Sequence, residues 1–173
     1  MNKSGALKIG LVIGKFSPLH NGHLDLFKFA IEMVDKLFIV VYNCPNITSI
    51  PLNERSGWIR SFLPYENIIV IDGWNAPNEH DDTIIVRNMQ EEYLSNVMSG
   101  INLTHIISSE DYGEHLSKFL KVENIVYDKK RKNRLISSTM IRKELDSYIN
   151  QVPKQIQEQV RKDIKSSRKK LMM

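Results

Sequence analysis

Residues 9–23 read IGLVIGKFSPLHNGH, and this stretch decides the fold that the sequence predicts. It begins with a short apolar run bounded by glycines, which indicates a buried β-strand over residues 7–16. Apolar residues then recur at helical spacing, which predicts an amphipathic helix over residues 23–36. A strand that leads through a glycine-containing turn into a helix is typical of the first half of a parallel β-α-β unit.

The same alternation continues along the chain, and it predicts an α/β fold with a Rossmann-like, five-stranded parallel sheet and helices on both faces. Ligands of such sheets bind beyond the carboxyl ends of the strands. We expect residues 1–150 to form this domain and residues 151–173 to form a basic C-terminal helix that packs on it or frays from it. The other predicted strands cover residues 37–43, 67–73, 104–109 and 125–127, and the other helices cover residues 53–62, 83–98, 112–120 and 138–149, with a last one opened by Pro153.

The bulk composition is that of an ordinary globular domain, with 173 residues, 42% of them hydrophobic and 25% charged. The net charge of +4 suits a polyanionic partner without separating a nucleotide from a nucleic acid. The single cysteine, Cys44, cannot form an intrachain disulfide. Without an apolar run long enough for a bilayer or a signal peptide, we expect a cytoplasmic protein with no membrane partner.

Two histidines and two glycines lie where the first strand leads into the first helix. His20 and His23 are three residues apart, so on a helical turn they lie on the same side. The N–H groups and the dipole of a helix N-terminus favour an anion. Gly14 lets a ligand approach the backbone, and Gly22, between the two histidines in the chain, leaves space for a phosphate. The pattern predicts a phosphate site; the simpler alternative is a histidine pair that only caps the helix.

A second candidate phosphate site lies at residues 136–142, ISSTMIR, at the start of another predicted helix. Serine and threonine are good N-caps, and Arg142 lies one turn further on. Hydroxyls, N–H groups and a guanidinium together suit a di- or triphosphate. An ordinary capped helix with a surface arginine remains the alternative. The loop at 129–134 before it has five cations in six residues, and it either screens pyrophosphate, is merely solvated, or contacts nucleic acid.

Three further places are candidate binding positions. The polar run at 108–113, SSEDYG, follows the fourth strand and either binds the nucleotide or is a polar turn. Arg55 begins the second helix and is either a ligand-binding or a surface salt-bridged arginine. Trp74 lies at the exit of the third strand in a polar loop, where its face could stack on a flat ring.

These motifs resemble those of one enzyme superfamily. The pattern G-x-F-x-P-x-H-x-G-H at residues 14–23 resembles the signature of the nucleotidyltransferases that include the nicotinamide-nucleotide adenylyltransferases. I-S-S-T-x-x-R resembles the C-terminal signature of the same superfamily, and SSEDYG is similar to a run in the adenylyltransferase half of bifunctional proteins that also carry a ribosylnicotinamide kinase. The resemblance covers roughly residues 7–150 and weakens at 74–82. The chain has no second phosphate-binding glycine loop, so no kinase activity follows.

The resemblance implies a nucleotidyltransferase fold and a reaction in which ATP and nicotinamide or nicotinic acid mononucleotide give the dinucleotide and pyrophosphate. Mg²⁺ would be bound mainly through the ATP phosphates, without dedicated metal-binding side chains. A homo-oligomer is left open, and we do not expect nucleic acid as a partner. The implied catalytic residues are His20, His23, Lys15 and Arg142; the implied nucleotide-binding residues are Gly14, Phe16, Gly22, Ser109, Glu110, Tyr112, Ser137, Ser138 and Thr139; the implied acceptor-binding residues are Arg55 and Trp74.

Four alternatives stay open. His23-Leu24-Asp25 resembles the pantetheine-phosphate adenylyltransferases, although that family usually has threonine where His20 stands. A cytidylyltransferase would typically carry F-D where this chain has Phe16-Ser17. The basic charge and the H-x-G-H pattern also fit an RNA binder, and a nucleotide sensor that does not react would carry the same phosphate sites.

Overall fold

The computed structural model describes residues 5–79, 82–130 and 132–173. Their five parallel strands form one sheet in the order β3-β2-β1-β4-β5. This confirms the predicted fold class. The strands are β1 (Ile9–Gly14), β2 (Lys36–Tyr42), β3 (Ile68–Gly73), β4 (His105–Ser108) and β5 (Glu123–Val126), and the helices between them are α1 (Asn21–Met33), α2 (Leu52–Phe62), α3 (Ile84–Val97) and α4 (Tyr112–Leu120).

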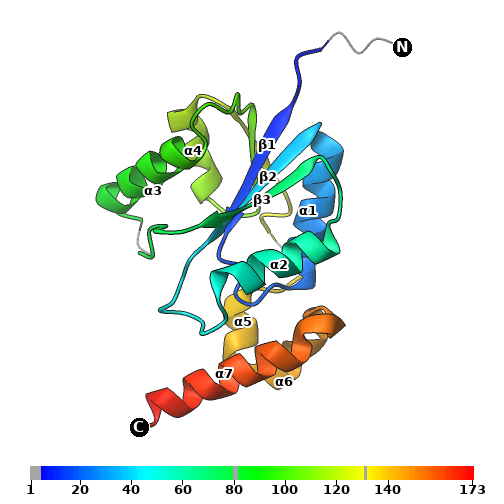
Figure 1. The fold of residues 1–173 in the computed structure, drawn as a ribbon, viewed down its shortest axis with the longest axis vertical. Coiled ribbons are helices and arrows are strands. Elements are labelled where there is room, and N and C mark those ends of the chain that lie inside the picture. Colours follow the sequence, from blue (N-terminus) through cyan, green and yellow to red (C-terminus); the bar gives the residue numbers. More distant parts are fainter. Residues whose placement is uncertain (1–4, 80–81, 131) are drawn as a thin grey trace.

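Helices cover both faces of the sheet, as Figure 1 shows: α1 and α2 lie on one side and α3 and α4 on the other. Alternate residues of each strand therefore enter different hydrophobic clusters. Val12 and Ile39 pack in the cluster that contains Phe27 of α1, whereas Leu11 packs in the cluster that contains Leu94 of α3. Burial on both faces explains why the strands read as continuous apolar runs rather than as alternating ones.

The order of the strands determines where a ligand can bind. The chain moves outward from β1 to β2 and β3, then returns to the other side of β1 to form β4 and β5. The connections on the two sides of this switch point diverge, which leaves a crevice beyond the carboxyl ends of β1 and β4. Both strands run directly into polar segments that the sequence analysis marked as candidate site residues.

Beyond the carboxyl ends of the strands lies a group of C-terminal helices, most of them short, at the bottom of Figure 1. These are α5 (Ser138–Lys143), α6 (Leu145–Tyr148), two 3-10 turns (Ile149–Gln151 and Lys154–Ile156) and α7 (Gln157–Leu171). Val160 and Ile164 of α7 are buried in the same cluster as the apolar face of α1. Burying an aliphatic side chain stabilises a fold by about 1.5–3 kcal/mol, so α7 is held to the domain by its apolar face.

The prediction of one helix over 138–149 is wrong. Glu144 has φ −129° and ψ 63°, so it breaks the segment into α5 and α6. The break turns Leu145 into the core, where it is 3% exposed. Arg168 of α7 meanwhile donates to the carbonyl oxygens of Arg142 and Lys143, which a continuous helix would have used itself. Pro153 precedes a 3-10 turn, and the last helix begins four residues after it.

Other boundaries differ by a few residues. The first strand ends at Gly14, because Phe16 has a positive φ of 47° and cannot continue an extended strand. The first helix begins earlier than predicted, at Asn21, with His20 as its N-cap. It ends at Met33 because Val34 is extended, and β5 begins at Glu123, two residues before the predicted start.

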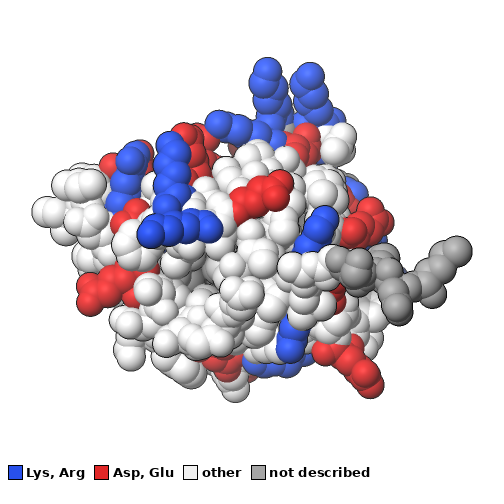
Figure 2. Space-filling model, turned by 90° about the horizontal axis from the view of Figure 1, so that it is seen from above, with Lys and Arg blue, Asp and Glu red and all other residues white. Residues whose placement is uncertain are grey.

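Figure 2 shows the end of the molecule at which β1 begins, opposite the short helices. Basic and acidic side chains are interspersed there around a largely uncharged centre. This view shows no continuous basic surface of the kind that tracks a nucleic-acid backbone. No helix in the described parts of the chain has both the length and the apolar character needed to cross a membrane.

Candidate active site

A cavity of about 1180 Å³ opens beyond the carboxyl ends of the strands. It brings together the β1–α1 turn, the loop after β4, the segment before α5 and the start of α3. Every site residue singled out from the sequence lines this cavity except Arg55 and Trp74. The two sequence motifs, more than one hundred residues apart, therefore belong to one site.

The β1–α1 turn stacks the two histidines at the N-terminus of α1. The rings of His20 and His23 are 3.6 Å apart between centroids, with an interplanar angle of 21°. The backbone N–H of His20 donates to Nδ1 of His23 over 3.3 Å. The edge of the Phe16 ring contacts His23 at 5.0 Å between centroids. His23 is thus oriented from two sides, with its ring at the wall of the cavity.

Both glycines of the turn are required by close packing. A Cβ on Gly22 would lie 3.0 Å from Nδ1 of His20 and 3.0 Å from Cγ2 of Ile136, which precedes the second motif. A Cβ on Gly14 would lie 2.9 Å from the ring of Phe16. Real Cβ contacts are rarely this short, so each glycine lets a ring or a distant segment approach the backbone.

The second motif docks onto the first through its polar side chains. Ser137 is the N-cap of α5, and its Oγ accepts from the N–H of Met140 over 3.2 Å. Ser138 Oγ donates to the carbonyl of Pro18 over 3.0 Å. Arg142 donates to the carbonyl of Ser17, and its other terminal nitrogen lies 3.1 Å from Oγ1 of Thr139. The arginine is therefore half-buried and fixed against the first motif, not extended from the surface.

Burial imposes a desolvation cost on the cationic side chains of the site, and their surroundings offset only part of it. Burial lowers the pKa of Lys15, an effect that Cys44 opposes and Arg142 reinforces. Burial also lowers the pKa of Arg142, opposed by Cys44 and Asp163. A group whose charged form is disfavoured in this way gains when an anion binds beside it. Polyphosphate is such an anion.

Arg55 does not line the cavity and is not at the surface either, since it is 1% exposed. Its guanidinium donates to three backbone carbonyls, those of Lys15, Tyr42 (3.0 Å) and Ile50 (3.3 Å). The alternative of a surface salt-bridged arginine is therefore wrong. Because Arg55 holds the carbonyl of Lys15, it shapes the β1–α1 turn from behind.

Trp74 is not brought to the cavity, because the turn after β3 directs it outward. The neighbouring Asn75 has a φ of 58°, and the Trp74 side chain is 57% exposed. An aromatic residue that the sequence did not single out lines the cavity instead. Tyr42, at the end of β2, is 6% exposed and lies edge-on to Tyr93 with 5.5 Å between centroids. Its position within an apolar strand gave no sign of this role.

The loop after β4 forms another wall, to which Ser109, Glu110 and Tyr112 contribute. The hydroxyl of Tyr112 donates to the carbonyl of Ile13 over 2.9 Å, so this loop is tied to β1. Burial raises the pKa of Tyr112, which keeps its hydroxyl protonated as a donor. Ser108 Oγ donates to the carbonyl of Glu110 over 3.0 Å and so shapes the bend between them.

The basic loop before α5 is tied down by carboxylates. Nε of Arg134 donates to Asp25 of α1 over 2.6 Å, and Lys129 forms an ion pair with Asp111. Asp128 accepts from the backbone N–H groups of Lys132 and Asn133, at 2.7 and 3.0 Å. Lys129 and Arg134 line the cavity, whereas Arg131 lies outside the described residues.

Comparison with known proteins agrees with this geometry. A protein-family model described as cytidylyltransferase-like matches residues 11–144, from β1 to the end of α5. The match spans both motifs and most of the chain. The chain belongs to the cytidylyltransferase-like family, and it is a nucleotidyltransferase. The resemblance of the two motifs to those of nucleotidyltransferases is thereby confirmed at the level of the superfamily.

Curated relatives narrow the class to adenylyltransferases. The chain is 29% identical to a phosphopantetheine adenylyltransferase of Streptococcus suis over 163 residues, which covers 90% of this chain and 96% of the relative. It is 28% identical to a protein of the same name from Fusobacterium nucleatum, covering 91% of this chain and 94% of the relative.

Solved structures with the same fold carry other names. A NadR protein in complex with NR has a TM-score of 0.61 at 22% identity, over 84% of this chain and 43% of that one. A bifunctional NMN adenylyltransferase/ADP ribose pyrophosphatase of Francisella tularensis has a TM-score of 0.59 at 21% identity, over 86% of this chain and 44% of that one. The chain thus spans less than half of these solved proteins, and the likeness concerns the fold.

Proposed function

We propose that this protein transfers AMP from ATP to nicotinamide mononucleotide, giving the dinucleotide and pyrophosphate. The observation that carries the proposal is the stacked His20–His23 pair at the N-terminus of α1, in one cavity with Lys15, Thr139 and Arg142. Histidine donors and a helix dipole would then meet one end of a polyphosphate, and half-buried cations would meet the other.

The chemistry needs little more than positioning and charge. The phosphate monoester of the acceptor is largely dianionic at neutral pH, because its second pKa is about 6, so no general base is required. Its oxygen attacks the α-phosphorus of ATP, a new P–O bond forms, and the bond to pyrophosphate breaks with both electrons leaving on pyrophosphate. Enzymes of this kind act by orienting two anions and stabilising the charge that develops.

The roles of the residues follow from their places in the cavity. His20 and His23 would contact the α-phosphate and the bridging oxygen, where charge accumulates. Lys15, Thr139 and Arg142 would hold the β- and γ-phosphates, and Gly14, Phe16 and Gly22 would keep the backbone close to them. Ser109, Glu110 and Tyr112 would bind the nucleoside, with Ser137 and Ser138 at the N-terminus of α5.

Mg²⁺ would enter with ATP and neutralise part of its charge. Among the described residues, no group of three or more histidine, cysteine, aspartate or glutamate side chains could hold a metal ion. This ion commonly binds through substrate phosphates and retained waters.

The cavity wall at the start of α3 favours an acceptor whose pyridine ring carries a neutral amide over one whose ring carries a carboxylic acid. It carries the carboxylates of Glu79 and Asp82 beside Gln90. Arg87, a cation of this wall, is bound by Asp82 through two hydrogen bonds of 2.7 and 2.6 Å. Because the charges of Asp82 and Arg87 offset each other, the preference depends on Glu79: its carboxylate suits a positively charged pyridine ring with an uncharged amide better than the extra carboxylate of nicotinic acid mononucleotide.

Phosphopantetheine is the second candidate acceptor, because the curated relatives that cover nearly the whole chain bear that name. Against it stands His20, at a position where that family usually has threonine. Both acceptors would react through a phosphate group. They differ only in the rest of the molecule, which the cavity must recognise.

Pyrophosphate release tests the proposal directly. Purified protein with ATP and Mg²⁺ is given nicotinamide mononucleotide, nicotinic acid mononucleotide or phosphopantetheine in parallel, with CTP replacing ATP as a control. We expect the fastest turnover with the amide mononucleotide and none with CTP. Turnover only with phosphopantetheine would keep the mechanism and replace the acceptor, and ATP binding without turnover would favour a nucleotide sensor.

A further inference from the structure

The C-terminal helix α7 contacts the supports of both phosphate-binding elements, and no motif in the sequence pointed to this. We propose that Asp163 and Arg168 of α7 are positioning residues that hold Lys15 and Arg142 in place for the triphosphate. The inference rests on the proposed function, since it assumes that these two cations bind ATP.

Asp163 anchors the segment that leads into α2. Its carboxylate is 9% exposed and accepts three hydrogen bonds: from Oγ1 of Thr48 (2.7 Å), from the N–H of Ser49 (2.8 Å) and from Oγ of Ser49 (2.5 Å). A carboxylate satisfied by three donors in a buried place is fixed in orientation. Residues 48–50 are therefore held against α7, more than one hundred residues away.

The anchored segment passes the constraint on to Lys15. The carbonyl of Ile50 accepts from Nε of Arg55, while a terminal nitrogen of Arg55 binds the carbonyls of Tyr42 and Lys15. If residues 48–50 moved, the guanidinium would lose one of its fixed partners and the turn that presents Lys15 would lose its support. Asp163 also favours the charged forms of Arg55 and Arg142 across space, so it offsets part of the cost of burying both.

Arg168 acts on the other element, α5. This helix has six residues, and the break at Glu144 leaves its last carbonyls without the partners that a longer helix would provide. A terminal nitrogen of Arg168 donates to the carbonyls of Arg142 (3.1 Å) and Lys143 (2.8 Å). The backbone of Arg142 is thus held from α7, while its side chain reaches Ser17 in the first motif.

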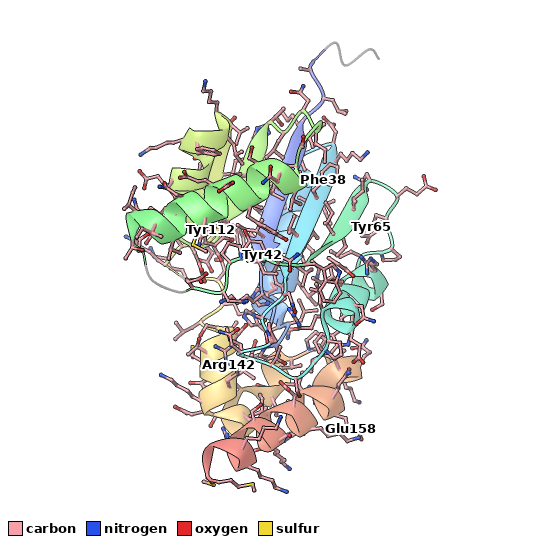
Figure 3. The ribbon with its side chains drawn as sticks, turned by 60° about the vertical axis from the view of Figure 1, so that its left-hand side comes forward. Phe38, Tyr42, Tyr65, Tyr112, Arg142 and Glu158 are labelled. Atoms are coloured by element: carbon pink, nitrogen blue, oxygen red, sulfur yellow. The ribbon has the colours of Figure 1, made fainter. Side chains whose placement is uncertain are left out.

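Both anchors belong to one helix whose apolar face is buried, so they move together. Asp163 lies between Val160 and Ile164, which pack into the core, and Arg168 follows Ile164 by about one helical turn. Figure 3 shows Arg142 on the helix that lies between the sheet and α7. The distance between Lys15 and Arg142 therefore depends on the position of α7 on the domain. This distance must match the length of a triphosphate.

Arg168→Ala is the first test because Arg168 is exposed and the variant should fold. Its control is Lys169→Ala, the exposed neighbour, which removes the same charge without removing a cap. ATP Kd is measured by calorimetry, kcat and both KM values by pyrophosphate release, and Tm by thermal unfolding. We expect Arg168→Ala to weaken ATP binding about five- to tenfold, the scale of one ordinary hydrogen bond lost, with the acceptor KM within about twofold.

Asp163→Asn with Ser49→Ala gives the second test, as a double-mutant cycle on ATP affinity. Each single change should weaken ATP binding, and the double variant should lose less than the sum, because both break the same anchor. Arg168→Lys should restore part of the affinity, since it keeps a donor near the carbonyls.

The outcomes separate the two proposals. Wild-type protein that binds ATP without turnover on any acceptor would overturn the proposed transfer, while the ATP Kd values of the variants still decide the inference. A lower Tm in Arg168→Ala with an unchanged ATP Kd would overturn the inference. The helix α7 would then stabilise the fold without affecting ATP binding. Equal effects of Arg168→Ala and Lys169→Ala would also overturn it, because charge rather than position would then be responsible.

Discussion

The two elements that we propose bind phosphate are built in opposite ways. The first, the β1–α1 turn, is a run of ten residues in which His20 and His23 contact each other three positions apart. The second, at α5, relies on contacts at sequence separations of 120 and 125 residues, from Ser138 to Pro18 and from Arg142 to Ser17. The first element thus follows from local sequence, and the second becomes a site only when it docks on the first.

The largest effect is expected from the locally built element, with His23→Ala. Removing the imidazole should lower kcat about 10²- to 10³-fold, the scale of losing one transition-state donor, while ATP Kd changes little. Steady-state kinetics and calorimetry check this. Asn21→Ala is the control, because Asn21 lies in the same turn of α1 but does not line the cavity. An unchanged kcat in His23→Ala would remove His23 from the mechanism.

Gly22→Ala tests the point where the two elements touch. The added methyl would crowd both His20 and Ile136, so we expect kcat to fall about tenfold or more and Tm to fall as well, since overpacking costs about 1–3 kcal/mol.

Gly57→Ala is the matched control. A Cβ on Gly57, inside α2, meets nothing within 4 Å, so this change should stabilise the protein by about 0.5–1 kcal/mol. If Gly22→Ala were as harmless as Gly57→Ala, the close approach of the two elements would not matter for activity.

Ser138→Ala weakens the docking of the second element without touching the histidines. Losing the hydrogen bond to the Pro18 carbonyl should raise the KM for ATP several-fold, in line with about 0.5–1.5 kcal/mol for one hydrogen bond. Ser147→Ala, an exposed serine on α6, should have no effect. A drop in kcat at unchanged KM would instead place Ser138 with the first element, in the chemical step.

The smallest effect concerns pH and Lys15. Because burial lowers its pKa below the ordinary 10.5, Lys15 should lose its charge earlier than an exposed lysine as pH rises. ATP affinity should therefore weaken with rising pH below 10.5, and Lys15→Arg should abolish this dependence. Stability should respond with the opposite sign, because a charge that folding disfavours ceases to cost stability once the proton is lost. Calorimetric titrations with ATP across this pH range measure the change in affinity, and thermal unfolding at each pH measures the change in stability.

Much of the fold could be predicted because each strand and most helices carry their own signal. The strands are buried on both faces and read as apolar runs, and α4 begins and ends at the predicted residues. The candidate site could be predicted where its residues are consecutive, as at 14–23 and 137–142. It could not be predicted for Tyr42, since an apolar strand residue gives no sign that it borders a cavity, nor for Trp74, which the turn at Asn75 directs outward.

By itself, the sequence determined the α/β class, the two motifs at residues 14–23 and 136–142 and the family to which they belong, because those depend on local periodicity and on short runs of particular residues. Only the tertiary structure decided that Arg55 is a buried support, that residues 138–149 form two helices, and that α7 forms hydrogen bonds with residues 48–49 and with the end of α5. The physical reason is that a guanidinium binds whichever carbonyls the fold brings within reach. Those carbonyls lie 5 to 40 residues away in the chain, and no local pattern records them.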